Sequence, residues 1–320
     1  MKKPDLIVLS HGGGVQTQTI AEMIVLGEIP KPDAAIFADT GDEPAYVYKQ
    51  VEYVKERLGT VGVPLIVVSN GNLHDDVYGG GRFAAMPLFT KLARAKKRRS
   101  GKKKVTQDNS LFPLSDYDDD SYDEFGETSG FGVSAQVLET GRMKRQCTYD
   151  YKIAPIDHEL RVMLLEMKLA KQRKDGSIVS LRQALVENWI GYTLDEVERI
   201  KPARHNWQRF AYPLIDRRMY KSDCISWLES NGLPIPLSSN CRKCPVISNS
   251  RALQMMANDP AGYENRLQFD RDLRNGTLRI AASAKGKLFV SPQLIPLEEV
   301  DILAPDQPSL LTCQNSICMT

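Results

Sequence analysis

A glycine-rich loop that separates an apolar run from a helix-like segment most constrains the fold of this chain. Residues 6–10 form a short apolar run that ends at His11 and the triplet Gly12-Gly13-Gly14, and apolar residues recur at helical spacing over 16–26. Consecutive glycines let the backbone approach a ligand closely, and the N-terminus of the following helix attracts anions. This order of strand, glycine loop and helix predicts a phosphate-binding α/β protein.

The loop departs from the two best-known phosphate-binding patterns. No Gly-Lys-Ser/Thr follows it, as a Walker A loop requires, and its spacing is not GxGxxG. A tight turn without a ligand is therefore the alternative interpretation, and His11 would either contact phosphate or fill the loop. If the loop binds phosphate, the expected contacts are Ser10, Gly12, Gly13, Gly14, Gln16 and Thr17.

Composition is that of an ordinary globular protein. The 320 residues are 42% hydrophobic and 26% charged, with a net charge of +2, so the overall charge does not indicate a nucleic-acid partner. Apolar runs are too short for a membrane span, and Met1 to Asp5 do not read as a signal peptide. We expect a cytoplasmic protein without a membrane partner. In that compartment closely spaced cysteines serve metal or redox chemistry more often than structural disulfides.

Alternating strand-like and helix-like segments predict the fold class. Apolar runs at 34–39 and 64–68 follow the first one, and helical spacing covers 45–58. This alternation predicts an α/β fold with a doubly wound parallel sheet and ligands at the carboxyl ends of the strands. Later segments predict helices at 156–169, 222–231 and 248–274, the last interrupted at Pro260, and a strand within 287–296. The expected domains are a nucleotide-binding half (1–90), a mobile charged insertion (91–135), the remainder of the α/β domain (136–235), and a cysteine-bearing helical region with a tail (236–320).

The charged insertion has a basic half and an acidic half. Basic residues dominate from Lys91 to Lys104, and acidic residues dominate from Asp116 to Glu127. Such a segment is either a solvated loop whose halves pair or, through its basic half, a contact to the phosphates of DNA or tRNA.

The second predicted strand ends in a polar loop beside the first. Asp39, Thr40 and Gly41 follow the apolar run, and Asp42 and Glu43 come next. A carboxylate at this edge is suited to Mg²⁺ or to a ribose hydroxyl, and Glu43 is suited to the same work or to capping the next helix.

Together, these two loops resemble the PP-loop superfamily, the ATP pyrophosphatase fold that includes phosphoadenosine-phosphosulfate (PAPS) reductases. The usual loop there reads Ser-Gly-Gly-x-Asp-Ser/Thr, so Gly12 replaces the serine, with Ser10 upstream as a substitute, and Gln16 replaces the aspartate. The resemblance implies an adenine nucleotide alpha-hydrolase-like fold and a site for ATP or a sulfated adenine nucleotide, with Mg²⁺.

A third segment, residues 142–156, adds to this resemblance. It is similar to the Arg-x-Cys…Lys…Pro signature of PAPS-reductase-like and DNA-phosphorothioation proteins, which implies that Arg145 and Lys152 neutralise phosphate charge, with Asp39 as the third catalytic residue. A helix start with a buried Cys147 is the alternative. The segment around Asp195 and Glu196 resembles a strand-to-loop segment of the same proteins, and we expect these two carboxylates at a helix start.

Close-spaced cysteines predict a metal or redox site. Cys241-Arg-Lys-Cys244-Pro245 is a CxxC, a spacing that fits zinc, a redox dithiol or an iron–sulfur cluster. The resemblance to iron–sulfur sulfonucleotide reductases implies a [4Fe–4S] cluster on Cys147, Cys224, Cys241 and Cys244, with zinc as the alternative. Those reductases have Cys-Cys where this chain has Cys147-Thr148, and Cys224 is the expected replacement. Cys313 and Cys318 are expected to form a redox pair or a metal clip, or to lie in a frayed end.

The overall pattern most resembles the PAPS-reductase-like proteins of phages and mobile elements. It implies ATP cleavage between the α and β phosphates and adenylation of a substrate, with sulfur insertion into nucleic acid from a sulfur donor protein as one outcome. A sulfonucleotide reductase and a non-catalytic nucleotide- or nucleic-acid-binding protein remain the alternatives.

Overall fold

The computed structural model describes residues 2–79, 84–91, 140–180, 183–282, 284 and 286–306. Of the predicted charged insertion it describes Lys91 alone, so the rest of the basic run to Lys104 lies outside the described residues. The same holds for Cys313 and Cys318, and the predictions for these residues stay predictions.

A parallel sheet of five strands forms the centre of the molecule, in the order β3-β2-β1-β8-β9. The strands are β1 (Leu6–His11), β2 (Ala34–Asp39), β3 (Leu65–Ser69), β8 (Val186–Ile190) and β9 (Gln208–Ala211). In register, Val8 of β1 pairs with Ala34 on one side and with Asn188 on the other. The strand order therefore reverses at β1, and ligands of such sheets bind at the carboxyl ends beside this reversal. The predicted doubly wound parallel α/β arrangement is confirmed.

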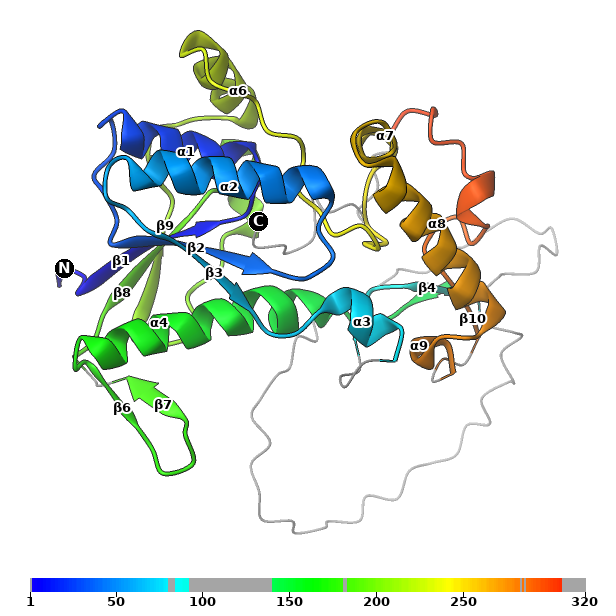
Figure 1. The fold of residues 1–320 in the computed structure, drawn as a ribbon, viewed down its shortest axis with the longest axis horizontal. Helices are drawn as coiled ribbons and strands as arrows, with labels where there is room; N and C mark the ends of the chain where they lie inside the picture. Colours follow the sequence, from blue (N-terminus) through cyan, green and yellow to red (C-terminus); the bar gives the residue numbers. More distant parts are fainter. Residues whose placement is uncertain are drawn as a thin grey trace, which may run out of the picture.

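Helices cover both faces of this sheet (Figure 1). Three of them, α1 (Val15–Val25), α2 (Ala45–Gly59) and α6 (Lys221–Ser230), lie on one face, and α4 (Ala154–Glu166) lies on the other. Side chains alternate between the faces, so Leu9 packs in the cluster under α1 and α2, whereas Val8 packs in the cluster under α4. The central strands β1 and β2 are buried on both faces, which explains why their sequences are nearly continuous apolar runs.

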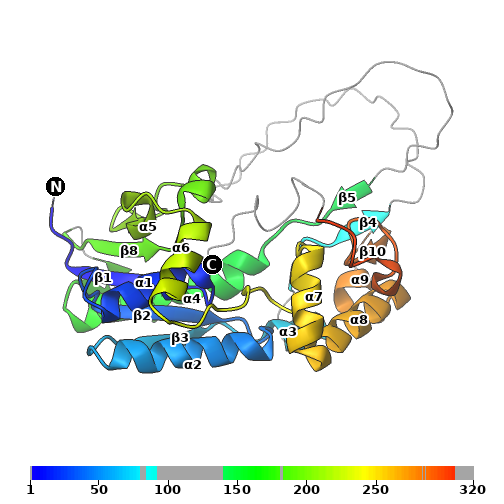
Figure 2. The ribbon, with the colours of Figure 1, turned by 90° about the horizontal axis from the view of Figure 1, so that it is seen from above.

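A second group of helices and strands lies to one side of the sheet, beyond the carboxyl ends of β2 and β3 (Figures 1 and 2). It consists of α3 (Leu73–Val77), α7 (Asn249–Asn258), α8 (Pro260–Asn275), α9 (Arg279–Ala282) and the antiparallel strands β4 (Phe89–Lys91), β5 (Thr140–Arg142) and β10 (Lys287–Phe289). Its core contains Met86, Tyr151 and Phe269. The break predicted at Pro260 is present, since Asp259 accepts a hydrogen bond from the Gly262 N–H at 3.0 Å and caps α8.

The strand predicted within 287–296 is shorter than expected. β10 ends at Phe289, and Pro292 and Pro296 follow within a few residues. Proline lacks the N–H that a sheet needs, which explains the early end. The remaining elements are the hairpin of β6 (Ala170–Gln172) and β7 (Ile178–Ser180), the short helix α5 (Pro213–Asp216), the π-helix η1 (Tyr149–Ile153), and the 3₁₀ turns η2 (Leu194–Arg199) and η3 (Leu297–Glu299).

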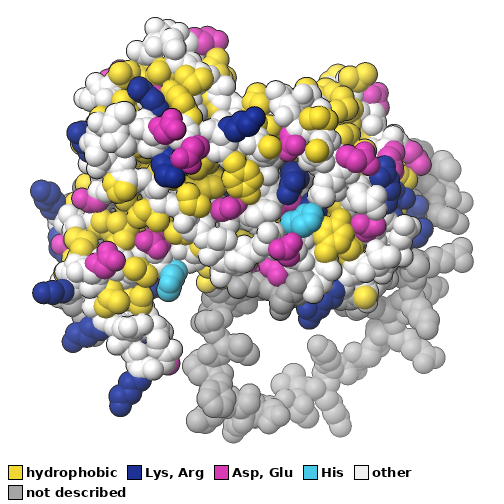
Figure 3. Space-filling view, viewed as in Figure 1, with side chains coloured by type: hydrophobic (Ala, Val, Ile, Leu, Met, Phe, Trp, Pro, Cys, Tyr) yellow, Lys and Arg dark blue, Asp and Glu magenta, His cyan; other side chains and the backbone are white. Residues whose placement is uncertain are grey.

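Figure 3 shows basic and acidic side chains interspersed with apolar ones over the face viewed in Figure 1. Within the described residues, no helix combines the length and the apolarity that crossing a membrane requires.

Candidate functional site

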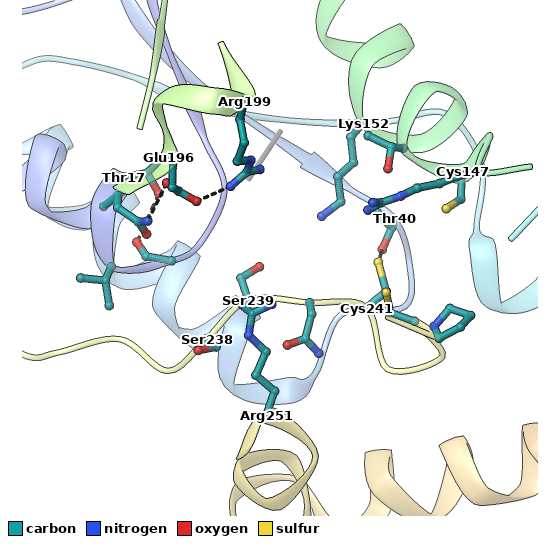
Figure 4. A pocket seen from close by; sticks show the side chains of 18 of the residues that line it. Thr17, Thr40, Cys147, Lys152, Glu196, Arg199, Ser238, Ser239, Cys241 and Arg251 are labelled. Atoms are coloured by element: carbon teal, nitrogen blue, oxygen red, sulfur yellow. Dashed lines mark hydrogen bonds and ion pairs between the residues drawn. The ribbon is translucent and has the colours of Figure 1, made fainter. Parts of the chain in front are cut away.

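A cavity of about 370 Å³ lies where the glycine loop, the loop after β2 and the CxxC segment meet (Figure 4). This volume is in the range of small-molecule sites, and its place at the carboxyl edge of a parallel sheet is where such folds bind ligands. The polar residues that line it are Gln16, Thr17, Thr40, Arg145, Cys147, Thr148, Lys152, Asp195, Glu196, Arg199, Lys221, Ser238, Ser239, Asn240, Cys241, Cys244 and Arg251.

The glycine loop presents the first turn of α1 to this cavity. Gly13 has φ +74°, and a Cβ there would lie 3.1 Å from Cγ1 of Val47 on α2, so the position favours glycine on both counts. Thr17 Oγ1 accepts a hydrogen bond from the Gly12 N–H at 3.2 Å and closes the loop. Gly14 is the N-cap and brings no side chain, so the backbone at the start of the helix borders the cavity directly. Such a helix start attracts anions.

Gln16 is paired with the loop that follows β8. Its Nε2 donates to Oε2 of Glu196 at 3.0 Å, and Glu196 also forms an ion pair with Arg199 (Figure 4). The 3₁₀ turn η2 therefore places a carboxylate beside the side chain of Gln16. The sequence predicted Asp195 and Glu196 at a helix start, which η2 confirms, but their place in the cavity wall was not predicted.

Five of the nine predicted nucleotide contacts do not line the cavity: Ser10, Gly12, Gly13, Asp39 and Gly41. Ser10 shares the α4 face of β1 with Val8, because side chains alternate along a strand, and its hydroxyl donates to Asn188 Oδ1 at 2.8 Å. Asp39 caps its own loop, where Oδ1 accepts hydrogen bonds from the Gly41 N–H at 2.8 Å and the Tyr48 hydroxyl at 2.9 Å.

Gly41, at φ +72°, closes this turn, and a Cβ on it would lie 2.6 Å from Cγ of Asn72. The side chain that the loop after β2 contributes to the cavity is Thr40.

Cationic side chains dominate the charge of the cavity wall. Five of the described lining residues are basic and two are acidic; the basic ones are Arg145, Lys152, Arg199, Lys221 and Arg251. Lys152 lies in the π-helix η1, its side chain is 12% exposed, and its Nζ lies 3.5 Å from Glu43 Oε1. Arg145 and Lys152, the two residues predicted to neutralise phosphate charge, both line the cavity. An excess of positive charge in a concave site favours an anionic ligand.

Three of the four predicted metal-binding cysteines line this cavity: Cys147, Cys241 and Cys244. The Cys241 Sγ lies 3.4 Å from Glu43 Oε1 and 3.5 Å from Thr40 Oγ1. Burial, together with the negative charge of Glu43, raises the pKa of the Cys241 thiol well above its ordinary value. In this geometry the Cys241 thiol donates a hydrogen bond to Glu43.

Cys224 lies elsewhere, so the predicted ligand set is corrected. Cys224 is fully buried in the core between α1 and α6, and burial raises the pKa of its thiol to about 12. Its neighbours in that core include Ile20 and Leu228, which are not metal ligands. Nowhere in the described part of the chain do three His, Cys, Asp or Glu side chains come together as a metal site. The four-cysteine set predicted for a [4Fe–4S] cluster or zinc is not assembled.

A buried ion pair joins the CxxC segment to the loop after β2, and no pattern in the sequence predicted it. Lys243, between the two cysteines of the CxxC, is completely buried, and its Nζ lies 2.6 Å from Asp42 Oδ1 and 2.6 Å from His74 Nδ1. Burial lowers the pKa of Lys243 and also that of His74.

Two uncharged residues of the cavity were not predicted from the sequence to contact a ligand. Asn240 is 4% exposed and Ser239 is 8% exposed, and their side-chain polar atoms have no hydrogen-bond partner among the described residues. Both line the cavity. Buried polar groups are normally satisfied, so these two indicate a ligand with hydrogen-bonding groups. The polar run Ser238-Ser239-Asn240 before the CxxC was the signal available in the sequence.

The chain was compared with models of protein families, with curated proteins and with solved structures. No family model matches it, and neither of the other two comparisons gave a significant match. The residues of the cavity therefore carry the functional conclusion.

Proposed function

We propose that this protein is a PP-loop-type enzyme that binds ATP in the cavity, cleaves it between the α and β phosphates and adenylates a substrate. One observation carries the proposal: the start of α1 and five basic side chains surround a cavity of about 370 Å³ at the carboxyl edge of the sheet. The glycine loop and the Asp-Thr-Gly segment, which resemble the PP-loop superfamily and its adenine nucleotide alpha-hydrolase-like fold, support the same reading.

The phosphates of ATP would lie against the start of α1, where helix N–H groups and the helix dipole favour negative charge. Lys152, Arg145 and Arg251 approach from the other walls and add charge-assisted contacts. The unsatisfied side chains of Ser239 and Asn240 are suited to ribose hydroxyls or to a base edge.

The chemistry follows from charge placement. A substrate oxygen attacks the α-phosphorus, the bond from that phosphorus to the α–β bridging oxygen breaks, and pyrophosphate leaves with the electron pair. Basic groups fixed around the cavity stabilise the charge that develops on pyrophosphate. A second nucleophile then displaces AMP from the substrate.

Mg²⁺, when bound with the nucleotide, would neutralise part of the phosphate charge. Mg²⁺ sites of this kind combine one or two carboxylates with phosphate oxygens and water. The carboxylates that line the cavity are Asp195 and Glu196, which fit this role better than Asp39, whose carboxylate caps its own loop.

ATP binding, measured by calorimetry, and AMP and pyrophosphate release, measured by chromatography, test the proposal. Lys152→Ala should weaken ATP binding about tenfold or more, since it removes one charge-assisted contact of about 1.5–3 kcal/mol. Lys171→Ala, on the exposed hairpin strand β6, is the matched control and should bind ATP as the wild type does. Absence of ATP binding by the wild type would refute the proposal.

The three cysteines in the cavity favour sulfonucleotide reduction as a second candidate. One thiolate would attack the sulfur of a sulfated nucleotide, the nucleotide phosphate would leave, and a second thiol would release sulfite and form a disulfide. Cys241 and Cys244 are spaced for that disulfide. Sulfite release from adenylyl sulfate substrates in the presence of a thiol reductant, lost in Cys244→Ser, would select this candidate.

A further inference from the structure

A second cavity, of about 210 Å³, is lined by residues of β8, β9 and α4 and of the loops that follow the two strands. Arg199 lines both this cavity and the first one, so the two sites share a wall. None of the residues that the sequence predicted to bind a ligand lines the second cavity.

Aromatic rings give the second cavity its character. Tyr192, Phe210 and Tyr212 line it, and Tyr192 and Tyr212 stack on each other with ring centres 5.9 Å apart and an interplanar angle of 13°. The guanidinium of Arg199 lies 4.5 Å from the centre of the Tyr192 ring. Stacked rings with a cation above them form a platform on which a further planar ring can stack.

Polar groups at the inner end and cations at the outer end complete the cavity. Asn188 and Gln208 are buried in its wall, and the Gln208 Nε2 donates to Asp157 Oδ1 at 2.7 Å. Lys201 and Arg204 are exposed lining residues, and the Arg204 guanidinium lies 4.7 Å from the centre of the exposed Tyr149 ring. The cavity therefore combines apolar ring surfaces and amide groups inside with positive charge at its rim.

We propose that the second cavity binds one unpaired base of a single-stranded nucleic acid, with the flanking phosphates against Lys201 and Arg204. Sequence-tolerant binding of single strands uses this combination of aromatic stacking and basic phosphate contacts. The inference rests on the proposed function, because the shared Arg199 places the base next to the ATP cavity and so makes it the acceptor. The proposal names single-stranded nucleic acid as the class of acceptor and keeps the first cavity as the nucleotide site.

Fluorescence anisotropy with short labelled single strands of RNA and of DNA tests the proposal on the full chain. Tyr212→Leu removes a stacking ring and should weaken binding about tenfold, and Tyr212→Phe, which keeps the ring, should bind as the wild type does. The double variant Lys201→Ala/Arg204→Ala should weaken binding and reduce the slope of log affinity against log salt by about 1.4, for two phosphate contacts. Lys171→Ala, on the separate β6–β7 hairpin, is the control for a nonspecific loss of positive charge.

ATP binding by the same variants separates the two proposals. Tyr212 does not line the first cavity, so Tyr212→Leu should bind ATP with unchanged affinity. Single-strand binding that is equal in the wild type, Tyr212→Leu and the double variant would overturn the inference. A wild-type protein that binds ATP but neither RNA nor DNA would also overturn the inference. Failure to bind ATP would instead refute the proposed function and leave the anisotropy result standing.

The double variant changes exposed side chains only, so it stays informative if Tyr212→Leu does not fold. Preference between RNA and DNA identifies the kind of strand.

Discussion

Lys243 and Asp42 form a completely buried ion pair, with Nζ 2.6 Å from Oδ1. The backbone N–H of Lys243 also donates to Asp42 Oδ2 at 3.1 Å, and the N–H of Arg242 donates to the Asp42 carbonyl oxygen at 2.7 Å. These contacts fix the CxxC loop against the loop after β2, so two walls of the first cavity are held in one arrangement.

Removing one partner of this pair should destabilise the protein strongly. Asp42→Asn leaves the Lys243 charge buried without its counterion, and changes of this kind cost about 3–5 kcal/mol. Chemical denaturation monitored by circular dichroism measures the loss. Glu52→Gln breaks the exposed pair of Glu52 and Lys55 and should cost less than about 1 kcal/mol. Equal stability of the two variants would contradict the prediction.

Gly13→Ala should affect both stability and ligand binding. Its φ of +74° alone costs an L-residue about 1 kcal/mol, and the new Cβ must also displace Val47. Gly27→Ala is a matched control, since Gly27 has φ +78° but open space around its Cβ position. The difference between the two variants in unfolding free energy measures the contact with α2. Loss of pyrophosphate binding in Gly13→Ala, but not in Gly27→Ala, would place the anion at the glycine loop.

The sequence predicted those parts of the molecule that depend on local pattern. Apolar runs and glycines indicated the parallel sheet and the first loop. The resemblance to sulfonucleotide reductases, rather than a local pattern, implied that Cys147 lies near the CxxC, and these cysteines line one cavity. The partners of Asp39 and Ser10 were not predictable, because they depend on how α2 and β8 pack against β1 and β2. Lys243 finds its partner 201 positions away, for which no local pattern exists.

The buried position of Cys224 was easier to predict from the sequence. Leu228 follows it by four residues, the spacing of one helix face, so a core role for Cys224 was readable from the pattern.

Cys224→Ala should leave the contents of the cavity unchanged. Because Cys224 lies in the core between α1 and α6, iron or zinc measured after anaerobic purification should be the same in Cys224→Ala and in the wild type. Its buried thiol, with a pKa of about 12, should also resist alkylation in the folded protein and react after unfolding. A lower metal content in Cys224→Ala than in the wild type would contradict the assignment.

Acid should destabilise the protein through His11. Burial lowers the pKa of His11 to about 4, whereas an unfolded histidine titrates near 6.5. Between these two values the unfolded chain binds a proton that the folded chain does not, so the free energy of unfolding rises with pH over this window. This contribution of about 3 kcal/mol to the free energy of unfolding is fully present above pH 6.5 and is lost as the pH falls toward 4. Denaturation at several pH values should show this slope in the wild type and in His158→Gln, which changes an exposed histidine of α4. His11→Phe, which keeps a ring beside Phe37, should lack the His11 part of the slope. An unchanged slope would show that the pKa of His11 is the same in the folded and the unfolded chain, and would contradict the prediction.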